Sequence, residues 1–165
     1  MKIDVAYGRD IDDSTLEQLQ YLEADAYAFY DRLDSELDSK EILIGIIPTE
    51  SMKHFKRRVA NTLFLMKTKK TKSGKTTVIA MACISKKGSK ADRCLHTVYV
   101  KPLHRRMGIG TAIIKKAVSI AKKDNLHLSL GVNPLNKIAM HLYESLGFNI
   151  SKGQSLTMEF NLTKR

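Results

Sequence analysis

Apolar residues recur along the chain with two different periods, and stretches of each kind alternate. Short runs of aliphatic, aromatic and β-branched residues are typical of strands, whereas apolar residues three and four positions apart are typical of helices. The strands expected from this pattern cover residues 3–5, 63–66, 78–84, 94–100, 126–132, 148–150 and 155–162. The expected helices cover residues 15–30, 48–59, 108–123 and 134–146.

Residues that commonly cap helices set the expected ends of two of them. Ser14 followed by Glu17 forms a capping box, in which side chains satisfy free backbone N–H groups at the helix start. Asn133 and Pro134 suit the cap and the first turn of the last helix, and Gly147 suits its end. The apolar face expected on this last helix consists of Ile138, Ala139, Leu142, Tyr143 and Leu146.

The order of the elements indicates one domain with a mixed sheet. A chain of 165 residues is of single-domain size. The strands at 63–66 and 78–84 should pair antiparallel across a polar turn. The strand, helix and strand between 95 and 132 should form a right-handed parallel crossover. We therefore expect an α/β (α+β) fold: a mixed, mostly antiparallel sheet of six to seven strands, with a central parallel β-α-β crossover and about four helices.

Charge is unevenly distributed along the chain. Residues 1–50 contain 13 acidic and 4 basic side chains, whereas residues 51–165 contain 4 acidic and 24 basic ones. A basic body suggests an anionic ligand, either a nucleic acid or a multiply phosphorylated cofactor. The acidic segment suggests a cationic second ligand. The alternative is that the charges serve only solubility and attraction between the two parts.

Cysteine content and hydropathy indicate in which cellular environment the protein is expected to occur. Cys83 and Cys94 have no metal-ligand spacing and are too few for a disulfide framework, so we expect reduced core residues and no metal. No apolar run reaches the length of a membrane span, so we expect no membrane partner. The acidic start of the chain does not resemble a signal peptide, and we expect a cytoplasmic protein.

The stretch from Leu95 to Thr111 combines a strand, a basic turn and a helix start. The glycines of the turn, Gly108 and Gly110, allow positive φ and close backbone approach. Free N–H groups and the helix dipole at such a start suit a phosphate group. Two common phosphate loops do not fit, because residue 113 is Ile113 where a dinucleotide fingerprint needs glycine, and residue 69 is Lys69 where a P-loop needs glycine.

Two motifs in this order resemble the GNAT superfamily of acyl-CoA-dependent N-acyltransferases. The family signature is Gln or Arg-x-x-Gly-x-Gly or Ala after a strand, and this chain has Arg105–Gly110 after Val100-Lys101-Pro102. The second feature is Asn-x-x-Ala followed by Tyr and Gly-Phe, which the chain matches over 136–148. The resemblance implies a single GNAT-like domain over 1–165, with an acceptor-side segment at 1–61 and an acyl-CoA-binding core at 62–162.

The resemblance also implies a set of residues that bind acetyl-CoA. Backbone N–H groups of the turn would hold the pyrophosphate, and arginines of the turn would reach the same phosphates. The strand edge at 98–100 would pair with the pantetheine arm, and the N–H of Val98 would face the acetyl carbonyl. The residues implied in cofactor binding are Val98, Val100, Arg105, Arg106, Met107, Gly108, Ile109, Gly110, Thr111 and Asn136.

Two candidate catalytic residues follow from the resemblance. Tyr143 would protonate the thiolate leaving group, because a phenol of pKa about 10 can protonate a thiolate whose conjugate acid has a pKa of about 8.5. Some amine acetyltransferases of the family carry a histidine nine residues before the arginine of the turn, and this position is His96. We expect the His96 side chain on the same sheet face as Val98 and Val100, where it would act as proton acceptor.

Other residues could act as the general base, and each of the two catalytic candidates could instead have a purely structural role. The glutamate that other members use two positions before the histidine is Cys94 here. Acidic residues of the first segment could instead act as base or bind the amine: Glu23, Asp25, Asp31 and Asp34. His96 could be a hydrogen-bonded structural histidine, and Tyr143 a core tyrosine of its helix.

The expected function is transfer of acetyl from acetyl-CoA directly to a primary amine, on a cationic small molecule or a protein. Dimers are common in the family, so the resemblance also allows a homodimer. One alternative is a basic nucleic-acid-binding module, but no recognition motif is present and we do not expect nucleic acid as partner. The other is a non-catalytic sensor that binds acyl-CoA.

Overall fold

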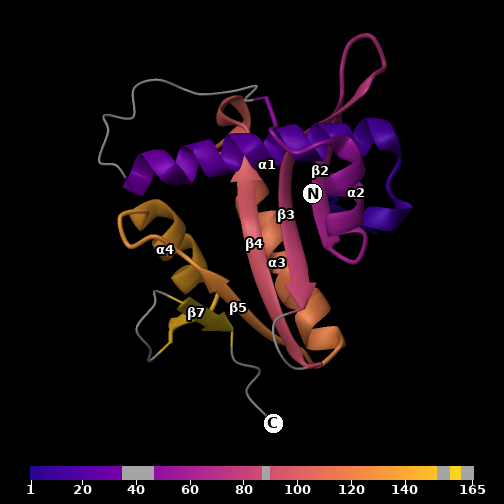
Figure 1. Ribbon diagram of the computed structural model, residues 1–165. Helices are drawn as coiled ribbons and strands as arrows, with labels where there is room; N and C mark the ends of the chain where they lie inside the picture. Colours follow the sequence, from indigo (N-terminus) through magenta and orange to yellow (C-terminus); the bar gives the residue numbers. More distant parts are fainter. Residues whose placement is uncertain (35–46, 87–89, 152–156, 161–165) are drawn as a thin grey trace.

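The computed structural model describes residues 1–34, 47–86, 90–151 and 157–160, and the side chains of 31–34 are left out of the description. Within these residues, seven strands form one sheet in the order β1-β2-β3-β4-β5-β7-β6 (Figure 1). The strands are β1 (Asp4–Tyr7), β2 (Leu63–Lys70), β3 (Thr76–Lys86), β4 (Asp92–Val100), β5 (His127–Gly131), β6 (Asn149–Ile150) and β7 (Thr157–Phe160). The helices are α1 (Asp13–Asp34), α2 (Met52–Val59), α3 (Ile109–Lys123) and α4 (Lys137–Ser145).

The pairing confirms the expected mixed sheet with its crossover. Strands β4 and β5 pair parallel, and α3 connects them. All other neighbouring strands in the described sheet pair antiparallel. The β4–β5 register covers only Asp92–Leu95 opposite His127–Leu130. The last part of β4, from His96 to Val100, therefore has no ladder partner on its β5 side.

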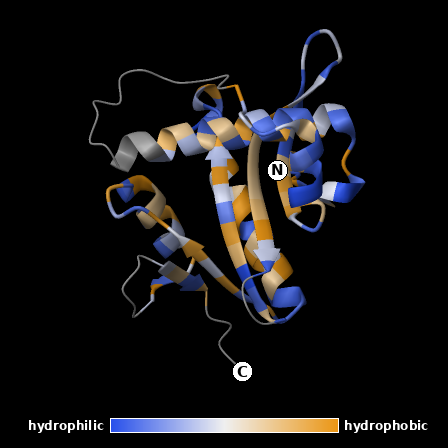
Figure 2. Cartoon of the chain, viewed as in Figure 1, coloured by the Kyte–Doolittle hydropathy of each residue, from blue (hydrophilic) through white to orange (hydrophobic). Residues whose placement is uncertain are grey.

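Two apolar cores lie on opposite faces of the sheet. Side chains of α1 and α2 pack on one face, around Leu19, Phe55 and Met81. Side chains of α3 and α4 pack on the other, around Ile113 and Tyr143. The central strand β3 is buried on both faces and is hydrophobic along most of its length (Figure 2). This two-sided burial explains why its sequence is a continuous apolar run.

A β-bulge in β4 overturns one expectation about His96. His96 lies opposite Cys83 and Tyr99 opposite Met81, so β4 has one more residue than β3 between these pairs. The backbone at Thr97 has a φ of 52°, in the left-handed region. The expectation that His96 shares a face with Val98 and Val100 is wrong, because an inserted residue reverses the alternation. Cys83, opposite His96, belongs to the α1-side core, whereas Val98 and Val100 pack against the α3-side core.

The helix starts differ from those expected. Helix α1 is capped by Asp12, whose carboxylate accepts from the Thr15 N–H at 2.9 Å and the Thr15 hydroxyl at 2.8 Å. Asp12 satisfies the first turn, so α1 begins ahead of the capping box expected at Ser14. Helix α4 is capped by Asn136 and not by Asn133, because the Asn136 side chain accepts from the Ala139 N–H at 3.1 Å.

Two further expectations about helices are corrected. Helix α2 begins at Met52 rather than at 48, and its N-cap is Ser51, whose hydroxyl accepts from the His54 N–H. On α4, Ile138 is 67% exposed and lies outside the core face on which we expected it. The shorter α4 places Ile138 in its first turn, at the edge of the pocket described below. Glu36, Asp38 and Glu41, which contribute to the acidic balance of residues 1–50, lie outside the described residues.

Candidate active site

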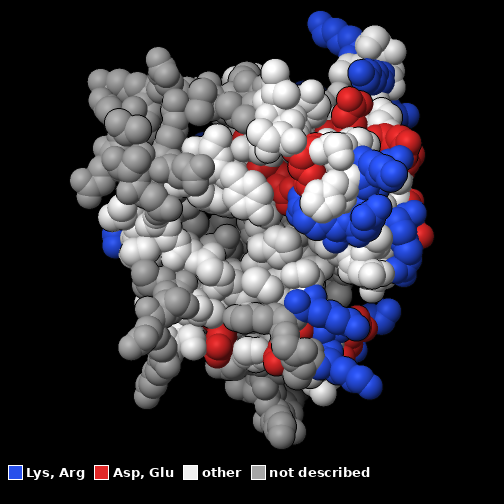
Figure 3. All heavy atoms as spheres, viewed as in Figure 1, with Lys and Arg blue, Asp and Glu red and all other residues white. Residues whose placement is uncertain are grey.

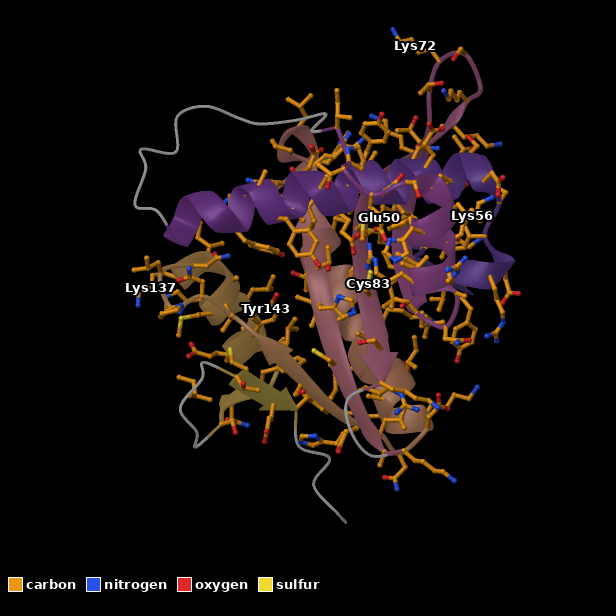
Figure 4. All side chains as sticks on the ribbon, viewed as in Figure 1. Glu50, Lys56, Lys72, Cys83, Lys137 and Tyr143 are labelled. Carbon is orange, nitrogen blue, oxygen red and sulfur yellow. The ribbon has the colours of Figure 1, made fainter. Side chains whose placement is uncertain are left out.

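A pocket of about 800 Å³ lies where β4 continues beyond its pairing with β5. Its walls come from α1, β4, the turn after β4, the start of α3, the end of β5 and α4. Tyr143 enters it from α4, on the side of β4 (Figure 4). The lining contains eleven of the residues expected at the site: His96, Val98, Val100, Arg105, Arg106, Gly108, Ile109, Gly110, Thr111, Asn136 and Tyr143. Met107 is 61% exposed and does not line the pocket.

The turn before α3 presents backbone N–H groups to this pocket. Arg106 and Gly108 both have positive φ, at 63° and 72°, so the chain reverses sharply before the helix. The Ala112 N–H donates to the Gly108 carbonyl at 3.0 Å, as the first bond of the helix. The N–H groups of 109–111 precede that bond and have no carbonyl within the helix to donate to. Together with the helix dipole, they form a site suited to an anion.

Gly110 lines the pocket and leaves space there because it has no side chain. A Cβ at this position would lie 3.6 Å from Leu142 Cδ2 and 4.0 Å from Val100 Cγ2. These are ordinary contact distances, so the glycine leaves a space of about one methyl group between α3, α4 and β4. That space lets a ligand approach the backbone of the helix start closely.

Arg105 is anchored within the protein. Its Nε donates to the Val100 carbonyl at 3.0 Å. Its guanidinium carbon lies 4.9 Å from the centre of the Phe29 ring and 5.6 Å from that of Tyr99. These contacts tie the turn to α1 and to β4. The Asn136 side-chain oxygen caps α4, which leaves the amide NH₂ as the group of this side chain available to a ligand.

Tyr143 is suited to hold a proton in the pocket. The side chain is 7% exposed, and its ring lies 5.8 Å from that of Phe148. Burial raises the pKa of Tyr143 to about 12. The phenol therefore stays protonated at neutral pH and has a proton to donate.

Three aromatic residues of α1 line the pocket and were not among the expected site residues: Tyr27, Phe29 and Tyr30. The Tyr30 hydroxyl donates to the Val98 carbonyl at 3.1 Å. Burial raises the pKa of Tyr30, so this donor keeps its proton. Tyr27 and Tyr30 lie on the mostly apolar stripe of the helix expected at 15–30, and this pair of hydroxyl-bearing rings is the sequence signal that could have pointed to the site.

His96 lies on the α1 face, with one ring nitrogen bonded and the other buried. Nδ1 is 3.1 Å from the Thr97 hydroxyl oxygen. Nε2 is buried and has no hydrogen-bond partner among the described residues. Burial lowers the pKa of His96, while the nearby charge of Glu23 opposes the shift and that of Arg58 adds to it. The imidazole is therefore neutral at pH 7 and can accept a proton.

Of the alternative acids on α1, Glu23 is paired within the protein. Arg58 on α2 pairs with the buried Glu23 and, at 2.8 Å, with Glu50, so one guanidinium bridges two carboxylates. Asp25 is 3% exposed. The side chains of Asp31 and Asp34 lie outside the described ones. Figure 3 shows acidic and basic side chains interspersed over α2 and the adjacent end of α1.

In the part of the chain that the structure describes, neither a metal-binding cluster nor a membrane-spanning helix is found. No group of three or more His, Cys, Asp or Glu side chains there could hold a metal ion. None of the helices described combines the length and the apolar character that crossing a bilayer requires.

The fold and parts of the sequence are similar to those of known acetyltransferases. Over 54 residues the chain is 48% identical to a thialysine N-epsilon-acetyltransferase of Bos taurus, which covers 32% of each protein. Over 57 residues it is 32% identical to the L-amino acid N-acyltransferase MnaT of Escherichia coli (strain K12), covering 34% of this chain and 33% of that one. The matched segments thus span about a third of these curated relatives.

A solved structure is similar over nearly the whole chain. The PaiA N-acetyltransferase from Thermoplasma acidophilum, in complex with coenzyme A, aligns with a TM-score of 0.58 and 17% identity. The alignment covers 96% of this chain and 98% of that one. The model of the acetyltransferase (GNAT) family matches residues 28–148, which include all eleven expected site residues found in the pocket. The chain therefore belongs to the acetyltransferase (GNAT) family.

Proposed function

We propose that the protein is an acetyl-CoA-dependent N-acetyltransferase that moves the acetyl group directly to a primary amine. The observation that carries this proposal is the pocket itself. It brings together a helix start with free N–H groups, a strand edge without a ladder partner and a buried, protonated tyrosine. In this proposal residues 62–162 form the acyl-CoA core, and residues 1–61 form the acceptor side.

The residues present fit acetyl-CoA as the acyl donor. The backbone from 107 to 111 would hold the pyrophosphate, with Arg105 and Arg106 beside it. The free edge of β4 at Val98 and Val100 would pair with the amide groups of the pantetheine arm. The Asn136 amide would bind the same arm or the phosphate side. A pocket of about 800 Å³ is within the usual size range of ligand sites.

The proposed chemistry requires two proton transfers. A lysine-like amine has a pKa of about 10.4, so forming its neutral state at pH 7 costs about 4.6 kcal/mol. His96 would accept the proton that the amine loses as its nitrogen bonds to the acetyl carbon. The Val98 N–H would stabilise the negative charge on the acetyl oxygen. Tyr143 would donate its proton to the sulfur as the carbon–sulfur bond breaks.

The acceptor we propose is an amine of a cationic small molecule or a protein. The support is the acidic balance of residues 1–50, with 13 acidic and 4 basic side chains. The acceptor end of the pocket is lined by rings and hydroxyls of α1 and β4, and no carboxylate is among its described lining residues. Tyrosine and phenylalanine rings suit a cationic or aliphatic amine.

The experiment that tests this function combines thermal unfolding with thiol release. Acetyl-CoA at a thousand times its Kd stabilises by about 4.1 kcal/mol, which raises Tm by about 10 °C for a domain of this size. We expect this shift, and free thiol production with at least one amine among thialysine, L-lysine, spermidine and a peptide with a free N-terminus. Arg106→Ala should reduce the shift, whereas Arg57→Ala, an exposed residue outside the pocket, should not.

Two outcomes would contradict the proposal in different ways. If millimolar acetyl-CoA does not raise Tm, the protein has no acyl-CoA site and the proposal is wrong. A full shift without thiol release from any amine would identify a protein that binds acyl-CoA without turnover.

A further inference from the structure

The hairpin between β2 and β3 projects beyond the rest of the sheet. Strand β1 pairs with β2 no further than Met66, and β4 pairs with β3 no further than Ala80. Beyond these points β2 and β3 pair only with each other. Figure 1 shows the two strands and their turn standing clear of the sheet. We call residues 67–77 the β2–β3 ribbon.

The ribbon is held in shape by its own turn and by a contact at its base. In the turn, the Thr71 N–H donates to the Lys75 carbonyl at 2.8 Å, and the Gly74 N–H donates to the Thr71 carbonyl at 3.0 Å. At the base, the Val78 N–H donates to the side-chain oxygen of Gln18 on α1 at 2.9 Å. A partner therefore meets a preformed surface and does not have to order it on binding.

The ribbon is strongly basic and contains no acidic residue. Its five lysines are Lys67, Lys69, Lys70, Lys72 and Lys75, and all but Lys67 are exposed. None of the five forms an ion pair with any residue that the structure describes. Figure 4 places Lys72 at the tip, far from the body of the sheet. The lysines therefore repel one another without compensation inside the protein, and an anionic partner would remove that repulsion.

Hydroxyl groups accompany the lysines along the ribbon. Lys70 lies opposite Thr76, and Lys69 lies opposite Thr77. The turn adds the hydroxyl of Ser73. Ammonium and hydroxyl groups are the side-chain donors that most often contact phosphate oxygens in nucleic acids. The ribbon has no aromatic side chain on which an unpaired base could stack, so its donors suit the backbone of a duplex better than a single strand.

We propose that the β2–β3 ribbon binds the phosphate backbone of double-stranded DNA, a site that does not depend on the proposed acetyltransferase function. The major groove of B-DNA, about 12 Å wide, admits a two-stranded ribbon, whereas that of duplex RNA is narrow. This partner differs from the expectation drawn from the sequence, which rested on the lack of a recognition motif. Contacts to phosphate carry no sequence information and need no such motif.

The proposed DNA site is separate from the pocket. No residue of the ribbon lines the pocket. Because β3 runs antiparallel to β4, the ribbon lies at the end of the sheet at which β4 leads into the turn before α3. DNA and acetyl-CoA should therefore bind at the same time, at two sites on one end of the molecule.

The test measures the fluorescence anisotropy of a labelled DNA duplex of about 20 base pairs and mixed sequence, titrated with the full chain between about 50 and 200 mM salt. The ribbon variant combines Lys69→Gln, Lys70→Gln and Lys72→Gln. The matched control makes the same change in net charge at three exposed lysines of α3 outside the pocket: Lys115→Gln, Lys116→Gln and Lys123→Gln.

We expect the ribbon variant to bind the duplex at least about tenfold more weakly than wild type at about 50 mM salt. Its plot of log affinity against log salt should be less steep by about 2 to 3, since each lost phosphate contact removes about 0.9. The control variant should keep the wild-type slope. Saturating acetyl-CoA should leave the affinity for DNA unchanged, and both variants should keep the thermal shift with acetyl-CoA.

Four outcomes would overturn the proposal. The wild-type protein fails to bind the duplex at low salt, or the two variants lose affinity equally, so that only net charge matters. Acetyl-CoA displaces the DNA, which would place the phosphates at the turn before α3. A polyglutamate peptide binds the ribbon as tightly as DNA, which would assign it to an acidic protein. A wild-type protein without an acetyl-CoA shift would contradict the proposed function alone.

Discussion

The hydroxyl of Tyr30 on α1 donates a hydrogen bond to the carbonyl of Val98 on β4, at 3.1 Å. The two residues are 68 positions apart in the chain. Their contact lies immediately after the bulge, where β4 no longer pairs with β5. The helix thus fixes one peptide group of the strand edge that we propose to bind the acyl donor.

Tyr30→Phe tests this contact. Loss of one neutral hydrogen bond should lower the free energy of unfolding by about 1 kcal/mol, or Tm by about 2–4 °C. Because the Val98 peptide would then be less well oriented, KM for acetyl-CoA should rise severalfold. Tyr21→Phe is the control on the same helix, and a Tyr30→Phe protein identical to it in both Tm and KM would show that the contact orients nothing.

The two glycines of the turn should respond differently to alanine. Gly108 has a φ of 72° with open space around its Cβ position, so Gly108→Ala should cost about 1–2 kcal/mol from backbone strain alone. Gly110 has no positive φ and lies in the first turn of α3, so Gly110→Ala should leave stability unchanged or raise it slightly. Urea unfolding measures both changes, and equal losses would contradict the assigned backbone conformation.

The coenzyme titration of the same variants adds a second readout. We expect Gly108→Ala to weaken acetyl-CoA binding, because the N–H groups that follow it change direction. Unchanged affinity in a folded Gly108→Ala protein would place the phosphate elsewhere.

Tyr143→Phe should separate catalysis from folding. The substitution keeps the burial of the ring and its contact with Phe148. The substitution removes only the hydroxyl, so Tm should change by less than about 2 °C, while kcat should fall by about 100-fold.

The pH dependence of kcat gives a further check on Tyr143. Burial raises the pKa of this phenol to about 12, so it is protonated below that pH and no loss of kcat due to Tyr143 should occur up to pH 10. A decline of kcat with an apparent pKa near 10 that Tyr143→Phe abolishes would contradict the burial of this group.

The Glu23–Arg58 pair should tune His96 in opposite directions. Glu23 raises the pKa of His96 and Arg58 lowers it, in addition to the larger lowering by burial. Glu23→Gln should therefore move the acid limb of kcat/KM to lower pH, and Arg58→Gln should move it to higher pH. Shifts of the same sign in both variants would exclude His96 as the group that titrates.

Stability measurements on the same pair serve as the accompanying control. Glu23→Gln should lower the free energy of unfolding by about 2 kcal/mol, because a charged hydrogen bond is lost. Arg58→Gln should cost about 3 kcal/mol, because it leaves the buried Glu23 carboxylate without its cation.

The sequence by itself predicted the part of the site that is built locally. The strand at 94–100, the turn with Gly108 and the helix at 108–123 follow from apolar periodicity and glycine placement within 30 residues, and the structure confirms them. The same holds for Tyr143 on the last helix. Helix caps were less predictable, because several polar residues near each start can satisfy the same N–H groups, and the structure uses Asp12 and Asn136.

Only the tertiary structure decided which residues meet across the pocket. The face on which His96 lies depends on the register between β3 and β4, and a register is a property of a pair of strands that neither strand encodes alone. The contact of Tyr30 with Val98 joins residues 68 positions apart in the chain. The apolar period along the sequence indicates which face of each helix or strand is buried. Which other element packs against that face is decided only when the helices and strands come together in the tertiary structure.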